Sequence, residues 1–159
     1  MPKLYHYTGF GQFRLILGDE QVMSSNARLA SDIAKQEGIA FEEAWLYFQK
    51  GLSGEIESGS QLGEIMRNNF VYFSRDMESA CYDGVSADAY KRGEMVILGF
   101  NADKHFFERL KPIPLARELS LEHLIEVHSQ PPVLSQVRHL LETMHGGKYR
   151  RIPIYEWLK

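Results

Sequence analysis

An unbroken apolar run near the middle of the chain constrains the fold more than any other feature. The run is Met95-Val96-Ile97-Leu98, and it lies within the segment 94–100. A half-buried strand alternates apolar and polar residues, whereas a strand buried on both faces is apolar throughout. The sequence therefore predicts a central strand at 94–100, around which the rest of the fold is arranged.

Further strands and helices are predicted on both sides of this strand. Strands are expected at 3–8, 70–74 and 149–157, and helices at 12–17, 26–68, 76–82 and 133–142. The segment 121–128 fits either a strand or a helix. Strands and helices mix without regular βαβ alternation, so the sequence predicts an α+β fold.

Local patterns refine some of these elements. Within 26–68, apolar residues spaced as i, i+3, i+4 and i+7 predict one buried helix face, made of Phe41, Ala44, Trp45 and Phe48. Gly18 is expected to end the first helix. The glycine and serine content of Gly51–Ser60 predicts a loop. Pro153 is expected to place the last strand at an edge of the sheet, because proline lacks an N–H for the ladder.

Composition sets the class of protein. At 159 residues, the chain is expected to form one domain, 1–159, with a core that needs no disulfide or metal. No apolar run approaches the roughly 20 residues that span a bilayer. One cysteine, Cys81, excludes an internal disulfide, and together these features predict a cytoplasmic protein without membrane contact. The formal net charge of -3 argues against wholesale nucleic-acid binding.

Two short segments carry polar side chains that are capable of chemistry. The first is Leu4-Tyr5-His6-Tyr7-Thr8 and the second is Val71-Tyr72-Phe73-Ser74. A single histidine on a strand is more often a structural residue with one hydrogen bond, and aromatic residues are simply favoured in strands. The order and spacing of the two segments therefore matter more than either residue alone.

In that order, the segments resemble the first two signatures of the ADP-ribosyltransferase superfamily, in the His-Tyr-Glu branch that includes the poly(ADP-ribose) polymerases. The first signature reads apolar-x-His-Gly-Ser/Thr, and Tyr7 stands here in place of the glycine; a helix with Ile16-Leu17 near its end follows. The second reads apolar-Tyr-Phe-Ala/Ser and is followed by Ser-x-x-Tyr, which resembles Ser79-Ala80-Cys81-Tyr82. The spacing from Val71-Tyr72-Phe73-Ser74 to Ser79-Ala80-Cys81-Tyr82 is about one residue shorter than in the family.

The third signature of this branch is a glutamate directly before a strand near the C-terminus. Glu122 is preferred here because an apolar run follows it directly. Glu118, Glu126 and Glu156 also lie near a plausible strand start, and the sequence alone does not choose among them. The catalytic glutamate is therefore predicted as Glu122, with the other positions left open.

The resemblance implies a split antiparallel β-sheet with helical insertions and a cleft for NAD as co-substrate. NAD cleavage passes through an oxocarbenium-like transition state, as in glycoside hydrolysis. By resemblance, the site residues divide into two groups. The catalytic group would be His6 on the adenosine ribose, Tyr72 against the nicotinamide ring, and Glu122 on the nicotinamide ribose. The cofactor-binding group would be Tyr7, Thr8, Ser74, Ser79 and Tyr82.

Within that second group, Tyr82 would stack on the nicotinamide opposite Tyr72 and Ser79 would bond the carboxamide. The backbone at Tyr7 would approach the nicotinamide amide while its side chain points away. Metal binding is not expected: in His123-x-x-Glu126-x-His128 the two imidazoles are five positions apart, which places them on opposite faces of a strand.

The function implied by the resemblance is transfer of ADP-ribose from NAD to a macromolecule, a protein rather than a nucleic acid. Small free-standing proteins of this kind include bacterial toxins and phage or defence effectors, which is an analogy with the family. Three alternatives remain: an NAD glycohydrolase, an RNA 2′-phosphotransferase on the same fold, and a catalytically inactive binding module. The last gains weight from Tyr7 and from the several candidate glutamates.

Overall fold

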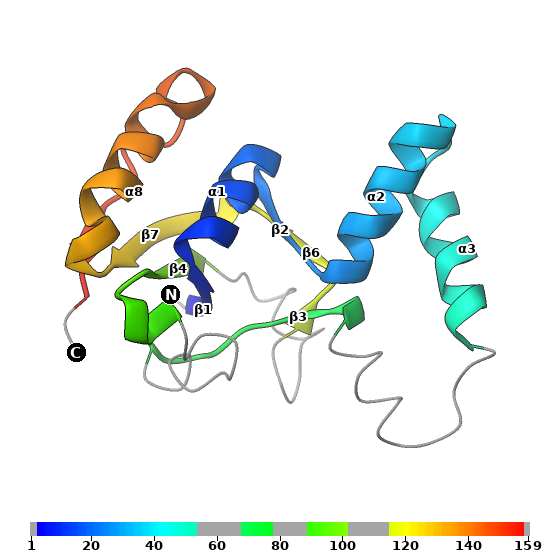
Figure 1. Ribbon diagram of the computed structural model, residues 1–159, viewed down its shortest axis with the longest axis horizontal. Helices are drawn as coiled ribbons and strands as arrows, with labels where there is room; N and C mark the ends of the chain where they lie inside the picture. The colour runs from blue at the N-terminus through cyan, green and yellow to red at the C-terminus, as the bar shows by residue number, and fades with distance from the viewer. Residues whose placement is uncertain (1–2, 54–67, 78–88, 102–114, 158–159) are drawn as a thin grey trace. The chain divides into compact units, whose positions relative to one another are not determined.

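The computed structural model describes residues 3–53, 68–77, 89–101 and 115–157 (Figure 1). Its chain divides into two compact units. Unit 1 comprises Met1–Gln21, Phe73–Pro114 and Ser120–Lys159, and unit 2 comprises Val22–Tyr72 and Leu115–Leu119. Each unit mixes helices with strands, so the chain has a mixed α and β architecture.

Unit 1 is built on a four-stranded sheet in the order β1-β4-β7-β8. The strands are β1 (Lys3–Gly9), β4 (Met95–Asn101), β7 (Leu124–Ser129) and β8 (Ile154–Glu156). The predicted central strand is confirmed as β4, which has a neighbour on each edge and is buried throughout 95–100. An uninterrupted apolar sequence has this outcome because both of its faces are covered.

The pairing of the strands differs in one respect from a wholly antiparallel sheet. β4 pairs antiparallel with β1 and with β7, but β8 runs parallel to β7. The expectation of an antiparallel sheet is therefore corrected to a mixed, open sheet. The parallel pair forms because α8 (Pro131–Thr143) follows β7 and returns the chain to the end at which β7 began.

Two helices of unit 1 contact the sheet and each other. α1 (Phe10–Asp19) contacts β1 and β4, and α8 contacts β7 and β8 (Figure 1). Their buried residues fall at helical spacing: Phe13, Ile16 and Leu17 on α1, and Val133, Val137 and Leu141 on α8. α1 continues past the predicted end at Gly18 to a left-handed Glu20, whose N–H bonds the carbonyls of the last turn.

Unit 2 contains two helices that pack against each other, α2 (Ser25–Glu37) and α3 (Phe41–Ser53). The helical segment predicted over 26–68 is thus broken at Gly38, which has a φ of 66° that favours glycine. The predicted face of α3 is confirmed in part: Ala44 is buried and packs with the partly buried Phe41 and Trp45 against alanines of α2, whereas Phe48 is only partly buried and lies outside this cluster.

The remaining elements are short. Unit 2 contains β3 (Val71–Tyr72), which pairs with β5 (Leu115–Ala116), and most of the pair β2 (Gln21–Met23) and β6 (Glu118–Ser120). The 3₁₀ turns η1 (Leu121–His123) and η2 (Met144–Gly147) lie in unit 1. The ambiguous segment 121–128 is η1 followed by β7.

Several predicted boundaries change. α3 includes residues 51–53 of the expected loop, and the rest of that loop lies outside the described residues. So does most of the helix expected at 76–82. The last strand is confined to Ile154–Glu156, and its place at the sheet edge next to Pro153 is as predicted. Within the described ranges, no helix is long and apolar enough to cross a membrane.

Candidate functional site

The two signature segments meet in unit 1 at the outer edge of β1. Tyr5 and Ser74 form an antiparallel bridge, in which the Tyr5 N–H donates to the Ser74 carbonyl at 2.7 Å and the Ser74 N–H donates back at 2.9 Å. The His6 ring lies 5.8 Å from the Phe73 ring, and Phe73 in turn lies 5.9 Å from Phe100. Residues that are far apart in the sequence are therefore direct neighbours here.

Successive side chains of β1 point to opposite faces of the sheet, so the residues of the first signature are divided between the two faces. His6 is half-buried and stands opposite Leu98 of β4, on the face that also carries Leu4 and Thr8. Thr8 is buried. Tyr7 belongs to the other face, where it is buried in a cluster with Met95 and Ile97. The Tyr7 side chain thus points away from the His6 face.

The other predicted residues are distributed more widely. Ser74 lies beside Tyr5, and its hydroxyl accepts a hydrogen bond from the Asp76 N–H at 3.5 Å. Tyr72 is in unit 2, on β3, with 36% of its surface exposed. Ser79 and Tyr82 lie outside the described residues.

Glu122 lies in η1, and His123 separates it from the first residue of β7. Its side chain is 73% exposed, and its carboxylate is 3.3 Å from the His123 ring. The η1 turn is fixed by the Ser120 hydroxyl, which accepts from the Glu122 N–H at 3.2 Å. This glutamate is therefore held on a defined turn while its carboxylate remains open to solvent.

The strand register keeps Glu122 and His6 apart within unit 1. Leu4, Phe100 and Leu124 are aligned across β1, β4 and β7. His6 lies two positions beyond this row, and Glu122 lies two positions before it. The two residues are separated by about 10 Å across the sheet and about 10 Å along it. The structure does not bring their side chains together.

Of the other three candidate glutamates, Glu156 is exposed at the end of β8, and Glu118 and Glu126 are engaged elsewhere. Glu126 pairs with Gly99, which pairs with Tyr5, so Glu126 lies on the face opposite to His6. Glu118 belongs to unit 2 and accepts a hydrogen bond from Arg117 at 2.9 Å.

Glu126 is the centre of the most buried charged cluster in the described part of unit 1. Its carboxylate is 2.6 Å from the Lys3 ammonium and also bonds the His128 ring, and its side chain is only 10% exposed. Burial raises the pKa of Glu126, but hydrogen bonds from Lys3 and His128 outweigh that effect and hold the pKa below its ordinary value. The carboxylate is therefore stabilised in its charged form.

A glycine makes room for this cluster. A Cβ added at Gly99 would lie 2.4 Å from Cγ of Glu126 and 3.4 Å from the Tyr5 ring. The Glu126 side chain therefore crosses directly over β4 toward Lys3. On its other side, the His128 ring stacks on Tyr155 with centroids 5.2 Å apart. The cluster joins β1, β7 and β8, which is a structural role.

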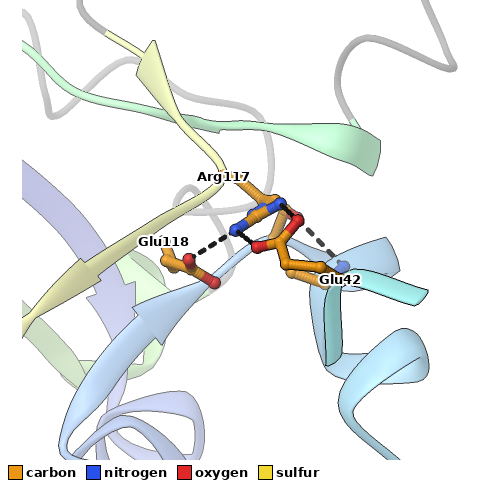
Figure 2. A network of polar contacts seen from close by, with 5 residues as sticks. Glu42, Arg117 and Glu118 are labelled. Atoms are coloured by element: carbon orange, nitrogen blue, oxygen red, sulfur yellow. Dashed lines mark hydrogen bonds and ion pairs between the residues drawn. The ribbon is translucent and has the colours of Figure 1, made fainter. Parts of the chain in front are cut away.

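Unit 2 has its own polar network around Arg117, which Figure 2 shows. The guanidinium donates two hydrogen bonds to Glu42, at 2.6 and 3.1 Å, and a third to Glu118. It also lies over the rings of Phe41 and Trp45, 4.8 and 5.1 Å from their centroids. These contacts use three of the five guanidinium N–H donors, so Arg117 fastens α3 to the β5–β6 segment.

Neither the Glu126 cluster nor the Arg117 network could be derived from the sequence. Their members come from distant positions, and a single sequence does not show which residues of two strands are paired.

The two histidines of the His123–His128 segment contact different glutamates: His123 contacts Glu122 while His128 contacts Glu126. Within the described part of the chain, no group of three or more histidine, cysteine, aspartate or glutamate side chains is arranged to hold a metal ion.

Comparisons of the chain with protein-family models, with curated proteins and with solved structures found no match.

Proposed function

We infer that the chain is an ADP-ribosyltransferase, which transfers ADP-ribose from NAD to a macromolecular acceptor. The observation that carries the inference is the bridge between Tyr5 and Ser74. It supports the resemblance because two signatures that are far apart in the sequence are hydrogen-bonded to each other. Two segments that matched the signatures by chance would not be expected to be hydrogen-bonded to each other.

The proposed roles follow from the resemblance. His6 would hold the adenosine ribose, Tyr72 and Tyr82 would stack on the nicotinamide, and Ser79 would bond its carboxamide. Glu122 would hold the 2′-hydroxyl of the nicotinamide ribose and offset the positive charge that develops as the glycosidic bond breaks. The exposure of Glu122 suits a residue that must meet a bound ligand, whereas Glu126 is occupied by Lys3 and His128.

A second candidate is an inactive module that binds a nucleotide or a protein through the same fold. The separation of His6 from Glu122 favours it, because catalysis requires both residues to contact one NAD molecule. An extended dinucleotide can reach residues that are not in mutual contact. The two candidates are therefore separated by an assay of turnover.

The experiment is incubation of the purified protein with NAD labelled in its ADP-ribose part, with and without a cell lysate that supplies acceptors. Label that moves onto a macromolecule indicates transfer. Free ADP-ribose with nicotinamide indicates hydrolysis, as in an NAD glycohydrolase. No turnover by the folded protein contradicts the enzyme and favours the binding module.

Three glutamine variants identify the glutamate. Glu122→Gln is expected to abolish transfer and to leave the melting temperature unchanged, because its side chain is exposed. Glu126→Gln is the matched control: it is expected to lower the melting temperature through loss of the Lys3 pair, yet to retain transfer by the folded fraction. Glu118→Gln is expected to retain transfer as well. Loss of transfer in Glu126→Gln or Glu118→Gln alone would contradict the assignment of Glu122.

A further inference from the structure

A pocket of about 380 Å³ lies in unit 1 at the start of α8. Its walls combine two cations with apolar rings. The cations are Lys91 and Arg92, and the rings are Trp157, Pro131 and Pro132. A cavity of this size, with apolar walls and few polar groups, is typical of a small-molecule site.

Gln130 supplies the polar group at the wall of this pocket. The residue is only 3% exposed, and its Oε1 accepts a hydrogen bond from the Met95 N–H at 3.0 Å. That bond fixes the orientation of the amide, because only the oxygen can face an N–H donor. The Nε2 group is therefore the end that Gln130 presents to the pocket, and it donates no hydrogen bond to any described residue.

The Nε2 group has no acceptor among the described residues, so it is open to the pocket and available to a ligand. An acceptor atom on a ligand would replace water at this amide. Lys91 and Arg92, which are exposed on the same pocket, favour a negatively charged acceptor. Arg92 is partly neutralised by Glu94, with its Nε 3.1 Å from that carboxylate, so Lys91 is the principal cation.

The pocket has a fixed wall because the cationic turn packs tightly against α8. Gly93 closes this turn with a φ of +73°, and a Cβ added there would lie 2.9 Å from Cγ of Pro132. Only glycine satisfies both conditions. The backbone that carries Lys91 and Arg92 is therefore fixed against the start of α8, while their side chains are exposed.

The donors available distinguish between kinds of anion. The first turn of α8 offers few amides, because Pro131 and Pro132 have no N–H and the Val133 N–H bonds the Gln130 carbonyl at 3.2 Å. A phosphate, with more acceptor oxygens, would depend on water for most of its hydrogen bonds. A carboxylate has two oxygens, which match one amide N–H and one ammonium.

We propose that this pocket binds a small organic carboxylate, with its charged end between Gln130 Nε2 and Lys91 and its apolar body against Trp157 and the two prolines. The site is separate from His6: Trp157 contacts Tyr7, with ring centroids 6.0 Å apart, and Tyr7 points away from the His6 face. The proposal is independent of the proposed transferase activity, and its test needs no NAD.

The probe is benzoate, added to the ¹⁵N-labelled full chain and followed by NMR. The chain has two tryptophans, so its spectrum has two indole N–H signals, which Trp157→Phe assigns. Benzoate is expected to shift the Trp157 signal and a glutamine side-chain signal that Gln130→Glu removes. The Trp45 signal in unit 2 is the internal control. Neutral benzamide and inorganic phosphate are expected to leave Trp157 unchanged.

Two variants test the recognition itself. Gln130→Glu keeps an oxygen for the Met95 N–H but replaces the donor by a second acceptor, so benzoate affinity should fall at least about tenfold. Lys91→Gln, at an exposed position where folding is not at risk, should weaken it by about threefold. The proposal is overturned if benzoate at about 50 mM, enough to fill a millimolar site, does not shift Trp157. It is also overturned if benzamide or phosphate binds as well, or if Lys91→Gln has no effect.

Discussion

The contact between Gly99 and Glu126 allows a sharp test of the packing in unit 1. In Gly99→Ala, the new Cβ would overlap Cγ of Glu126 at 2.4 Å, so the Glu126 side chain must move. Moving it breaks the 2.6 Å pair with Lys3 and the bond to His128. Overpacking of this kind destabilises a core by about 1–3 kcal/mol. We expect a loss of about 2 kcal/mol, or about 4–8 °C in melting temperature for a chain of this length.

The same substitution should behave differently once Glu126 is shortened. In a Glu126→Ala background, the atoms that collide with the new Cβ are absent, and the nearest remaining contact in this set is the Tyr5 ring at 3.4 Å, an ordinary distance. Alanine is also favoured over glycine within a strand by about 0.5–1 kcal/mol. Gly99→Ala is therefore expected to be neutral or slightly stabilising there, which gives a coupling of about 2–3 kcal/mol between the two positions.

The assay is urea unfolding of the four proteins of this cycle, followed by circular dichroism. Gly18→Ala is the matched control: an added Cβ meets nothing within 4 Å there, and the helix should gain about 0.5–1 kcal/mol. An equal loss from Gly99→Ala in both backgrounds would refute the reasoning, because the loss would then come from the strand backbone and not from Glu126.

Three further predictions concern charge and capping. The folded pKa of Glu126 lies below its ordinary value of 4.5. The ionised carboxylate therefore stabilises the fold fully above pH 4.5, and this stabilisation is lost as the pH falls through the folded pKa. Glu126→Gln should therefore reduce the difference between the free energies of unfolding measured at pH 7 and at pH 3. Arg117→Lys keeps the charge but loses the fork to Glu42 and the stacking on two rings, so unit 2 should lose about 1 kcal/mol in urea unfolding, whereas an unchanged midpoint would show that charge alone suffices. Ser24→Ala removes the hydroxyl that accepts from the Ala27 N–H at 3.1 Å, and should lower the free energy of unfolding by about 1 kcal/mol; an unchanged value would show that this cap does not stabilise α2.

The sequence was most informative where one residue type decides the local outcome. The apolar run predicted β4 because only a strand covered on both faces can hold it. Pro153 indicated an edge position since it cannot donate to a ladder. The spacing around Ala44 predicted which face of α3 packs on α2, although Phe41 and Trp45 are only partly buried. In contrast, the pattern over 26–68 predicts one helical segment, although the left-handed φ of Gly38 ends α2.

The candidate site depends on information that one sequence does not contain. Strand register decides which of Glu118, Glu122 and Glu126 is buried. Glu126 is engaged because Lys3 lies on β1, with β4 between the two residues. Similarly, the sequence does not indicate Gln130 as a binding residue, because the Met95 N–H, which is distant in the sequence, sets the orientation of its amide. Local patterns predict elements, whereas pairings between distant segments decide which polar groups are left to act.

The pairing of β1 with β4 also has a consequence for synthesis on the ribosome. β1 at residues 3–9 has its partner at residues 95–101, and β4 in turn pairs with β7 at 124–129. β1 therefore leaves the exit tunnel long before β4 and cannot form this ladder until the segment 95–101 has also been translated. Meanwhile α2 and α3 can form their contact early, because they are neighbours in the sequence. Contacts between distant segments form slowly, and an unpaired strand is prone to aggregate during that delay. Nascent unit 1 is thus the part of this chain that would depend most on a chaperone.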